Sequence, residues 1–252
     1  MTPALHTLRR GTPGAPLRFV MVHGWTCDHG AMAPVAAAFP EADSTLVDLL
    51  GHGRSPKADS YAIADQAAAA LEATAGRAVW VGHSMGAQVA LEAARQAPDR
   101  VAGVVLLDPA FIVPTDKALA FGQGMQAQLA RVDIPAMIEV FGRNQIVSAS
   151  DPAAVEAMVA TMRATDPAVT RAAWDAILGW DGRAALDAMP CPGIVIAIDK
   201  PLNRLADLAR VNNKLMTGQV AGSGHMIQFE VMDQVAAMMR RFLKLNGLLS
   251  DG

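Results

Sequence analysis

Clustered positive charge and long apolar runs are both missing from the sequence, and each absence excludes a class of protein. The net charge is −3, and the basic doublets Arg9-Arg10 and Arg240-Arg241 are isolated. A surface for nucleic acid or anionic lipid needs a basic patch. The longest apolar stretch, 101–114, contains Asp108 and is shorter than the roughly 18 residues of a membrane span. We therefore expect no nucleic-acid partner and no membrane partner.

Cysteine is scarce as well, with Cys27 and Cys191 the two in the chain. They match no metal-binding spacing, and we expect free thiols in a reducing compartment. The N-terminal stretch MTPALHTLRR has no apolar core of the kind that a signal peptide requires. These observations predict a cytoplasmic protein. No set of His, Asp and Glu shows ligand spacing, so neither a metal nor another cofactor is expected.

The sequence does contain apolar strand-like runs that alternate with alanine-rich helical runs. Its 252 residues are enough for one large domain with a full core. The expected strands are 17–22, 44–49, 78–81, 101–107, 194–198 and 217–221, and the expected helices are 32–39, 63–75, 84–96, 205–213 and 231–245. Continuous apolar strands between helices indicate a parallel sheet covered on both faces. The predicted fold class is therefore α/β, an open, mostly parallel sheet whose sites form at the carboxyl ends of its strands.

One interval, 109–190, breaks this alternation because it holds no convincing strand. It contains helical pieces at 117–131 and 152–163, and two more that carry Trp174 and Trp180. Such a length is too great for a loop in a compact domain. A single helical crossover is the alternative, but Pro135, Pro152 and Pro167 favour several helices. We interpret residues 111–190 as a helical cap over the strand ends, and residues 1–110 and 191–252 as the core that carries it.

The stretch GHSMG, 82–86, places a serine between two glycines after an apolar run. The pattern G-x-S-x-G between a strand and a helix is typical of a nucleophile on a strained bend, where the glycines let neighbouring backbone pass close by. A helix N-cap is the simpler interpretation of Ser84. The strand before it and the helix after it favour a nucleophile.

A serine hydroxyl needs a base, and the base needs a carboxylate that fixes its tautomer. His225 is the one late histidine, in the loop GSGHM between the last expected strand and the last helix. Asp108 and Asp199 each follow a strand, and both keep the order Ser, Asp, His. Either aspartate could instead cap the segment after its strand. The oxyanion needs two N–H donors; Met85 follows the nucleophile, and Trp25 follows the strand-end turn His23-Gly24.

Together these residues resemble the α/β-hydrolase superfamily, through VMVHGW, DLLGHGRS, GHSMG and GSGHMIQFE in that order. The resemblance implies an eight-stranded, mostly parallel sheet with a cap inserted after the sixth strand. Only one strand-like segment, near 4–9, precedes LRFVMV, which indicates that the first strand of the family is missing. Most members carry the acid after the seventh strand, but the turn AIDKPLNR lacks the usual glycine. Some, including lactone hydrolases, carry it after the sixth, so we favour Asp108 over Asp199.

These features predict a serine hydrolase of a small, fairly apolar ester or lactone, with Ser84, His225 and Asp108 as triad and Trp25 and Met85 as oxyanion donors. GWTCDH also resembles cofactor-free ring-opening dioxygenases on this fold, which would use the His–Asp pair to deprotonate a heteroaromatic substrate. Hydrolysis of a carbon–carbon bond is a further alternative. So is a ligand-sensing protein with slow turnover, whose signature would be an exposed apolar patch on the cap. The sequence leaves substrate identity and oligomeric state open.

Overall fold

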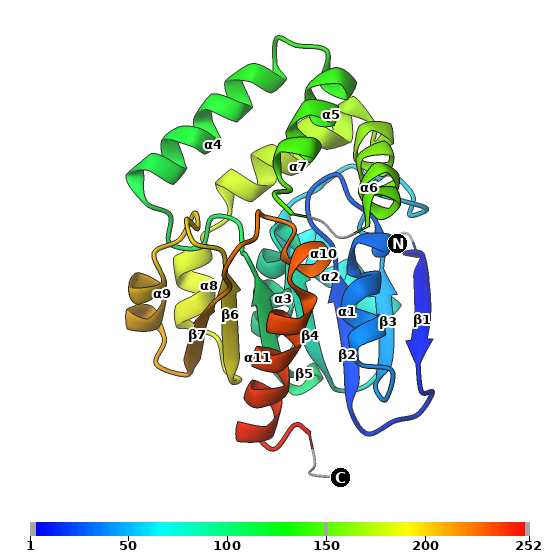
Figure 1. Cartoon of the computed structure of the whole chain (residues 1–252), viewed down its shortest axis with the longest axis vertical. Helices are drawn as coiled ribbons and strands as arrows, with labels where there is room; N and C mark the ends of the chain where they lie inside the picture. Colours follow the sequence, from blue (N-terminus) through cyan, green and yellow to red (C-terminus); the bar gives the residue numbers. More distant parts are fainter. Residues whose placement is uncertain (1–3, 149–150, 250–252) are drawn as a thin grey trace.

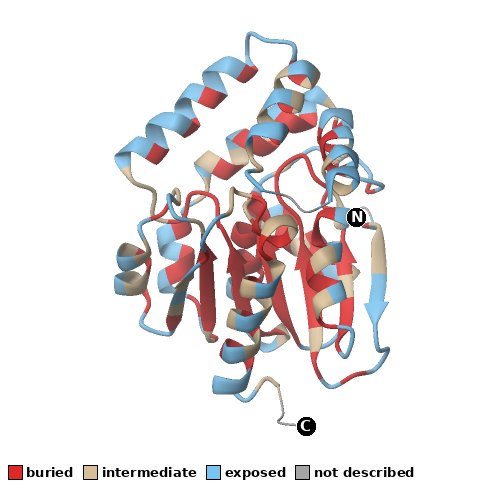
Figure 2. Ribbon diagram, viewed as in Figure 1, coloured by how far each residue is buried: buried red, intermediate tan, exposed pale blue. Residues whose placement is uncertain are grey.

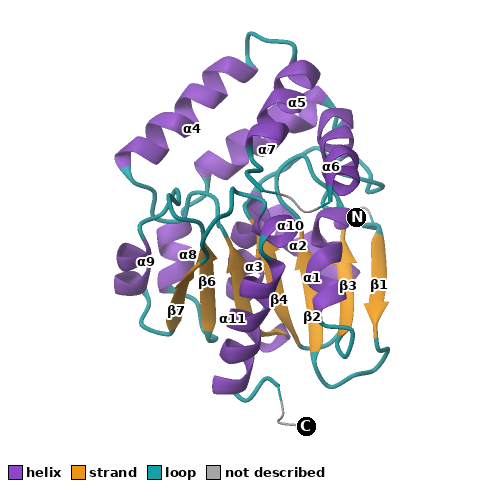
Figure 3. Cartoon of the chain, viewed as in Figure 1, coloured by secondary structure: helices purple, strands orange, loops and turns teal. Residues whose placement is uncertain are grey.

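A computed structural model describes residues 4–148 and 151–249. Within these ranges the strands form one sheet in the order β1-β3-β2-β4-β5-β6-β7, in which β1 is antiparallel to β3 and every other pair is parallel (Figures 1 and 3). The strands are β1 Thr7–Gly11, β2 Arg18–Val22, β3 Asp43–Val47, β4 Ala78–His83, β5 Val101–Leu107, β6 Gly193–Ala197 and β7 Leu215–Gln219. The predicted α/β class with a mostly parallel open sheet is confirmed.

Helices cover both faces of the sheet because the central strands are apolar on both sides. In β2, Phe19 and Met21 pack in one core cluster and Val20 and Val22 in the other. The first cluster contains side chains of α1 (Ala33–Ala38) and α11 (Met232–Leu245), and the second contains side chains of α2 (Ile63–Ala73) and α3 (Met85–Gln96). Alternate residues of one strand therefore pack under opposite helix layers. Figure 2 shows the sheet as the most buried layer.

The sheet differs from the expected eight strands at its first edge. The described residues form seven strands, and β1 is the strand-like segment that precedes β2. Among the described residues, β1 is the only strand beyond β3 at this edge, which agrees with the single strand-like segment found before β2 in the sequence. The cap follows β5, the fifth described strand, and not a sixth strand as expected. The expectation counted the strands of an eight-stranded sheet, which has one more strand before β1.

Four helices between β5 and β6 lie beyond the carboxyl ends of the strands (Figure 1). They are α4 Asp116–Leu129, α5 Ile134–Asn144, α6 Pro152–Ala164 and α7 Pro167–Gly179. The side chains that accept N–H groups at their starts are Thr115, Asp133, Asp151 and Asp166. Proline occupies the first turn of α5, α6 and α7, where its missing N–H costs nothing. The three prolines therefore begin helices, which explains why the segment folds as separate pieces.

The last part of this segment belongs to a different layer. Helix α8 (Gly182–Asp187) lies beside the sheet, next to α3 and α9 (Leu205–Val211), and not over the strand ends (Figure 1). A Cβ on Gly182 would lie 2.6 Å from the Cα of Ile112, so the two ends of the segment meet closely. The division of the chain at 111 and 190 remains a prediction.

Both cysteines are buried free thiols, as expected. Burial raises the pKa of Cys27 to about 12 and that of Cys191 to about 11, so each thiol stays protonated near neutral pH. In the part of the chain that the structure describes, no helix is both long and apolar enough to cross a membrane.

The start of α3 packs so closely on β2 that Gly86 tolerates no side chain. A Cβ there would lie 2.2 Å from the Val22 carbonyl oxygen and 2.6 Å from that of His23. We expect Gly86→Ala to lower the free energy of unfolding by about 3 kcal/mol, since backbone must move to make room. Gly124→Ala is the matched control, because a Cβ on this exposed glycine of α4 meets nothing within 4 Å. Urea denaturation measures both; equal stability of the two variants would contradict the prediction.

Candidate active site

Ser84 lies on a strained bend between β4 and α3. Its φ is 55° and its ψ is −115°, a conformation in which a residue with a side chain is strained. A Cβ on Gly82 would lie 2.1 Å from the Gly86 carbonyl oxygen, so the bend requires glycine on its first side as well. The Ser84 side chain makes no capping hydrogen bond to α3. The strained bend expected from GHSMG is therefore present, and the N-cap interpretation of the serine does not hold.

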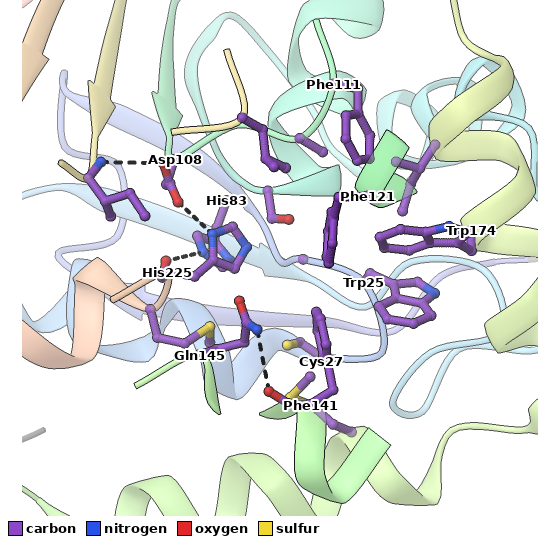
Figure 4. Close-up of a pocket in the computed structure, with 18 of the residues that line it drawn as sticks. Trp25, Cys27, His83, Asp108, Phe111, Phe121, Phe141, Gln145, Trp174 and His225 are labelled. Atoms are coloured by element: carbon purple, nitrogen blue, oxygen red, sulfur yellow. Dashed lines mark hydrogen bonds and ion pairs between the residues drawn. The ribbon is translucent and has the colours of Figure 1, made fainter. Parts of the chain in front are cut away.

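His225 and Asp108 meet at the carboxyl edge of the sheet. Their Nδ1 and Oδ2 atoms lie 2.6 Å apart, and Figure 4 marks this contact with a dashed line. Asp108 follows β5, is 4% exposed, and accepts a second hydrogen bond from the Ile198 N–H at 3.3 Å. The carboxylate therefore holds the proton of the imidazole on Nδ1 and leaves Nε2 as the basic nitrogen.

Asp199, the other aspartate that follows a strand, lies elsewhere. It is exposed and lines a shallow surface hollow together with Gln219. Its backbone carbonyl accepts a hydrogen bond from the Gln219 side chain at 3.2 Å. Of the two aspartates left open by the residues alone, the geometry thus brings Asp108, and not Asp199, to His225.

Ser84, Asp108 and His225 line the same cavity, whose volume is about 250 Å³. The rest of its wall is mostly apolar and aromatic, and its largest side chains are Trp25, Phe111, Phe121, Phe141 and Trp174 (Figure 4). The Trp25 and Trp174 rings lie 4.6 Å apart, and Phe141 packs edge-on against Trp25 at 5.6 Å. The cap helices α4, α5 and α7 contribute Phe121, Phe141 and Trp174. The strand ends supply the polar groups of the cavity, and the cap supplies much of its apolar wall.

The loop after β2 passes directly beside the nucleophile bend. A Cβ on Gly24 would lie 3.2 Å from that of Ser84. Nε2 of His23 accepts the Leu49 N–H at 3.0 Å, so Nδ1 donates to the Gly24 carbonyl at 2.8 Å. Burial lowers the pKa of His23, and the ring stays neutral in this tautomer. It thereby fixes the backbone that precedes Trp25.

Trp25 and Met85, the predicted oxyanion donors, lie next to the bend in sequence or in space: Trp25 follows Gly24, which packs against Ser84, and Met85 follows Ser84 directly. Trp25 lines the cavity, and its ring N–H donates to the Thr170 carbonyl of α7 at 2.9 Å. Met85 is the first residue of α3, and the N–H groups of a first helical turn have no partner within the helix. Their assignment as oxyanion donors remains a prediction.

His83 has a positioning role that the sequence did not reveal, although the residue is part of GHSMG. Its buried ring donates from Nε2 to the His225 carbonyl at 3.0 Å, and the two rings lie 4.7 Å apart. Burial lowers the pKa of His83 to about 3, so it stays a neutral donor near neutral pH. The residue before the nucleophile therefore supports the backbone of the histidine loop.

Glu230, in the short helix α10 (Ile227–Glu230), was also missed. Its Oε1 accepts the Gly224 N–H at 3.0 Å, next to His225. Its Oε2 accepts the N–H groups of Val147 and Ser148, at 2.8 and 2.7 Å, from the connection that follows α5. One carboxylate thus joins the cap to the histidine loop. The motif GSGHMIQFE contains this glutamate, but no local pattern shows that its partners lie in the cap.

A cluster of possible metal ligands lies outside this cavity. Donor atoms of His6, His29 and Asp48 lie within 4.8 Å of one another. The Asp48 carboxylate already accepts the backbone N–H groups of His29 and Arg54, at 2.7 and 2.9 Å, and the His29 ring at 2.8 Å. These bonds give the carboxylate a role in holding two loops. The cluster matches no metal-binding motif in the sequence because its three residues come from separate segments of the chain.

Known proteins resemble this chain in sequence and in fold. A family model described as an alpha/beta hydrolase family matches residues 19–238. The chain belongs to this family. As a member, it is 45% identical to lipase LipV of Mycobacterium tuberculosis over 42% of each chain. It is 41% identical to a pimeloyl-[acyl-carrier protein] methyl ester esterase of Methylococcus capsulatus over 38% of each chain.

These curated matches therefore span about two fifths of the relatives' length. Solved structures match over far more of the chain at lower identity. The enol-lactonase from Burkholderia xenovorans LB400 has a TM-score of 0.81 at 20% identity and covers 95% of this chain and 96% of its own. An esterase from Thermogutta terrifontis has a TM-score of 0.79 at 21% identity, covering 96% and 93%. At these identities the structures establish the fold.

The two aspartates can be separated by matched amide substitutions. Because Asp108 holds the His225 tautomer, we expect Asp108→Asn to lower kcat for a p-nitrophenyl ester about 10⁴-fold. Asp199→Asn changes an exposed carboxylate outside the cavity, and we expect kcat within about twofold of the original. Steady-state kinetics on both variants is the measurement. A larger loss in the Asp199 variant would reverse the assignment.

Glu230→Gln keeps the size of the side chain but leaves a single acceptor oxygen in place of two. We expect kcat to fall about tenfold with KM nearly unchanged, since one hydrogen bond to a charged acceptor contributes about 1.5–3 kcal/mol. Glu41→Gln is the control, because this exposed carboxylate also loses an ion pair, with Arg240 of α11, away from the cap and the cavity. If kcat is retained while only the free energy of unfolding falls, Glu230 has a purely structural role.

Proposed function

We propose that the protein is a serine hydrolase that cleaves small, fairly apolar carboxylic esters or lactones through an acyl-enzyme. The observation that carries the proposal is the 2.6 Å bond between His225 and Asp108 at a cavity that Ser84 also lines. The strained backbone at Ser84 also supports the proposal, because strained residues of this kind cluster at active sites. The names of the partly aligned relatives, a lipase and a methyl ester esterase, agree with ester chemistry.

The mechanism follows from the roles of these groups. Nε2 of His225 takes the proton of the Ser84 hydroxyl as its oxygen attacks the carbonyl carbon. Asp108 stabilises the imidazolium, and the N–H groups of Trp25 and Met85 bind the developing oxyanion. His225 then protonates the leaving alcohol, and the acyl-enzyme forms. Water, deprotonated by His225, releases the acid and restores the serine; with a lactone, alcohol and acid leave as one hydroxy acid.

The cavity favours a small substrate. Its volume of about 250 Å³ lies below the roughly 300–1,000 Å³ typical of sites for drug-sized ligands. Aromatic rings from both the core and the cap line it, so an apolar acyl or alcohol group would be desolvated there. The cap thus selects substrates by shape, while the strand ends perform the chemistry.

The dioxygenase alternative gains nothing from the geometry of GWTCDH. Asp28 accepts the Gly30 N–H at 2.8 Å and His29 pairs with Asp48, so the aspartate and the histidine of the motif hold loops. Neither lines the cavity. Trp25 does, as part of its apolar wall. Ester hydrolysis uses Ser84, whereas deprotonation of a heteroaromatic ring would not require it.

The ligand-sensing alternative is favoured by one observation, the apolar surface of the cap. Phe121 is 44% exposed and Val140 is 61% exposed, and Leu119 and Val132, in the same part of the cap, are exposed as well. Such a surface is a common feature of protein interaction sites. Turnover decides between the two functions: a kcat near zero across a panel of short esters would favour a sensor.

Ser84→Ala tests the nucleophile directly. We expect a fluorophosphonate probe to label the original protein at Ser84 and to leave the variant unlabelled, and kcat for p-nitrophenyl butyrate to fall by about 10⁴-fold or more. Ser60→Ala, at an exposed loop position, is the control and retains labelling. Peptide mapping identifies the labelled residue. Labelling at another serine, or full activity of the Ser84 variant, would contradict the proposal.

A further inference from the structure

Lys200 gives the cavity a positive charge that the proposed mechanism does not use. It is the one lysine or arginine among the described residues that line the cavity. It follows β6, in the loop between Ile198 and Leu202, and both of these neighbours line the cavity as well. Asp199, between Ile198 and Lys200, faces the separate hollow on the other side of the loop. Ile198, Lys200 and Leu202 of this loop therefore face the cavity, whereas Asp199 faces the hollow on the other side.

The backbone that carries Lys200 is fixed at both ends. Gln219 donates from Nε2 to the carbonyls of Ile198 and Asp199 at 3.0 and 3.2 Å. At the other end, Asn203 is 1% exposed and donates from Nδ2 to two carbonyls, both at 2.8 Å, of Pro109 and Ala110. Its Oδ1 accepts two further N–H groups, at 2.8 and 2.9 Å, from Ile112 and Val113. The lysine is thus presented from a rigid rim beside the first residues after Asp108.

No carboxylate of the described residues neutralises this lysine. Its ammonium makes no ion pair with Asp199 or with Asp108, whose oxygens are engaged by His225 and the Ile198 N–H. Two histidines also line the cavity: His83 stays neutral because burial lowers its pKa, and His225 is the proposed base, already paired with Asp108. The cavity therefore combines an aromatic interior with one uncompensated positive charge at its rim. Such an arrangement attracts and orients an anion.

We propose that Lys200 binds a carboxylate of the substrate, so that the ester or lactone carries a free acid group remote from the carbonyl that Ser84 attacks. The inference rests on the proposed function and narrows its substrate class to half-esters and acidic lactones. An apolar linker of a few carbons would lie along the aromatic wall while the acid remains at the wetter rim. A partly exposed ion pair between Lys200 and the substrate carboxylate would favour acidic over neutral substrates modestly. It would also speed the association of an acidic substrate at low ionic strength.

The test compares monomethyl adipate with methyl adipamate, which has a neutral amide in place of the carboxylate. We expect kcat/KM, followed by methanol release, to be about fivefold higher for the acid, the factor that 1 kcal/mol represents for an exposed ion pair. Lys200→Met removes this preference, Lys200→Arg retains it, and high salt weakens it. Lys117→Met, an exposed lysine of α4 outside the cavity, is the control and keeps the preference.

A binding measurement makes the test independent of turnover. Trp25 and Trp174 line the cavity, so their fluorescence reports titration with dicarboxylates from glutarate to suberate and with their diamides. Saturable binding of a diacid that is about fivefold tighter than binding of its diamide, with a difference that Lys200→Met removes, supports the inference. Equal binding of diacids and diamides, or an acid preference that survives in Lys200→Met, overturns it. If the fluorophosphonate probe does not label Ser84 of the original protein while diacids still bind in a Lys200-dependent way, the hydrolase proposal is overturned and the carboxylate site is retained.

Discussion

The close approach of the α3 start to the end of β2 is the contact on which the site depends. The carbonyl oxygen of Val22 occupies the space where Gly86 would carry a Cβ, and the Gly86 carbonyl does the same for Gly82. These two contacts leave Ser84 no relaxed conformation, and they bring Gly24 against its side chain. One packing constraint thereby sets both the bend at Ser84 and the loop after β2, since neither can shift without separating a helix from the sheet.

Asp108 and His225, the proposed acid and base, depend on a second set of bonds. Asp108 is held by the β6 edge through the Ile198 N–H, while the backbone at His225 and at Gly224 is held by His83 and Glu230 respectively. All of these contacts lie at the carboxyl ends of neighbouring parallel strands, where such sheets bring distant segments together. Each hydrogen bond is modest by itself. Together they fix a ring that must neither rotate nor withdraw from the serine.

The sequence predicted the features that local chemistry determines and missed those that depend on distant contacts. A glycine pair around Ser84 and a glycine-rich loop around His225 are readable because backbone strain demands particular residues at particular spacings. The choice between Asp108 and Asp199 could not be made from the residues alone, because both follow apolar strands and the one that meets the imidazole depends on how distant segments pack. The bond from Glu230 to Val147 was hidden for the same reason, since it joins segments with no common pattern.

Shape selection and catalytic geometry are consequently not independent in this protein. Helix α5 contributes Phe141 to the cavity wall, and the connection that follows it donates the N–H groups of Val147 and Ser148 to Glu230. The same carboxylate holds Gly224 beside His225. A change in α5 that widens the cavity is therefore also expected to displace the loop that carries His225. Substrate range and rate should vary together when α5 changes, whereas the rim loop at Lys200 is anchored separately by Asn203 and can alter charge selection alone.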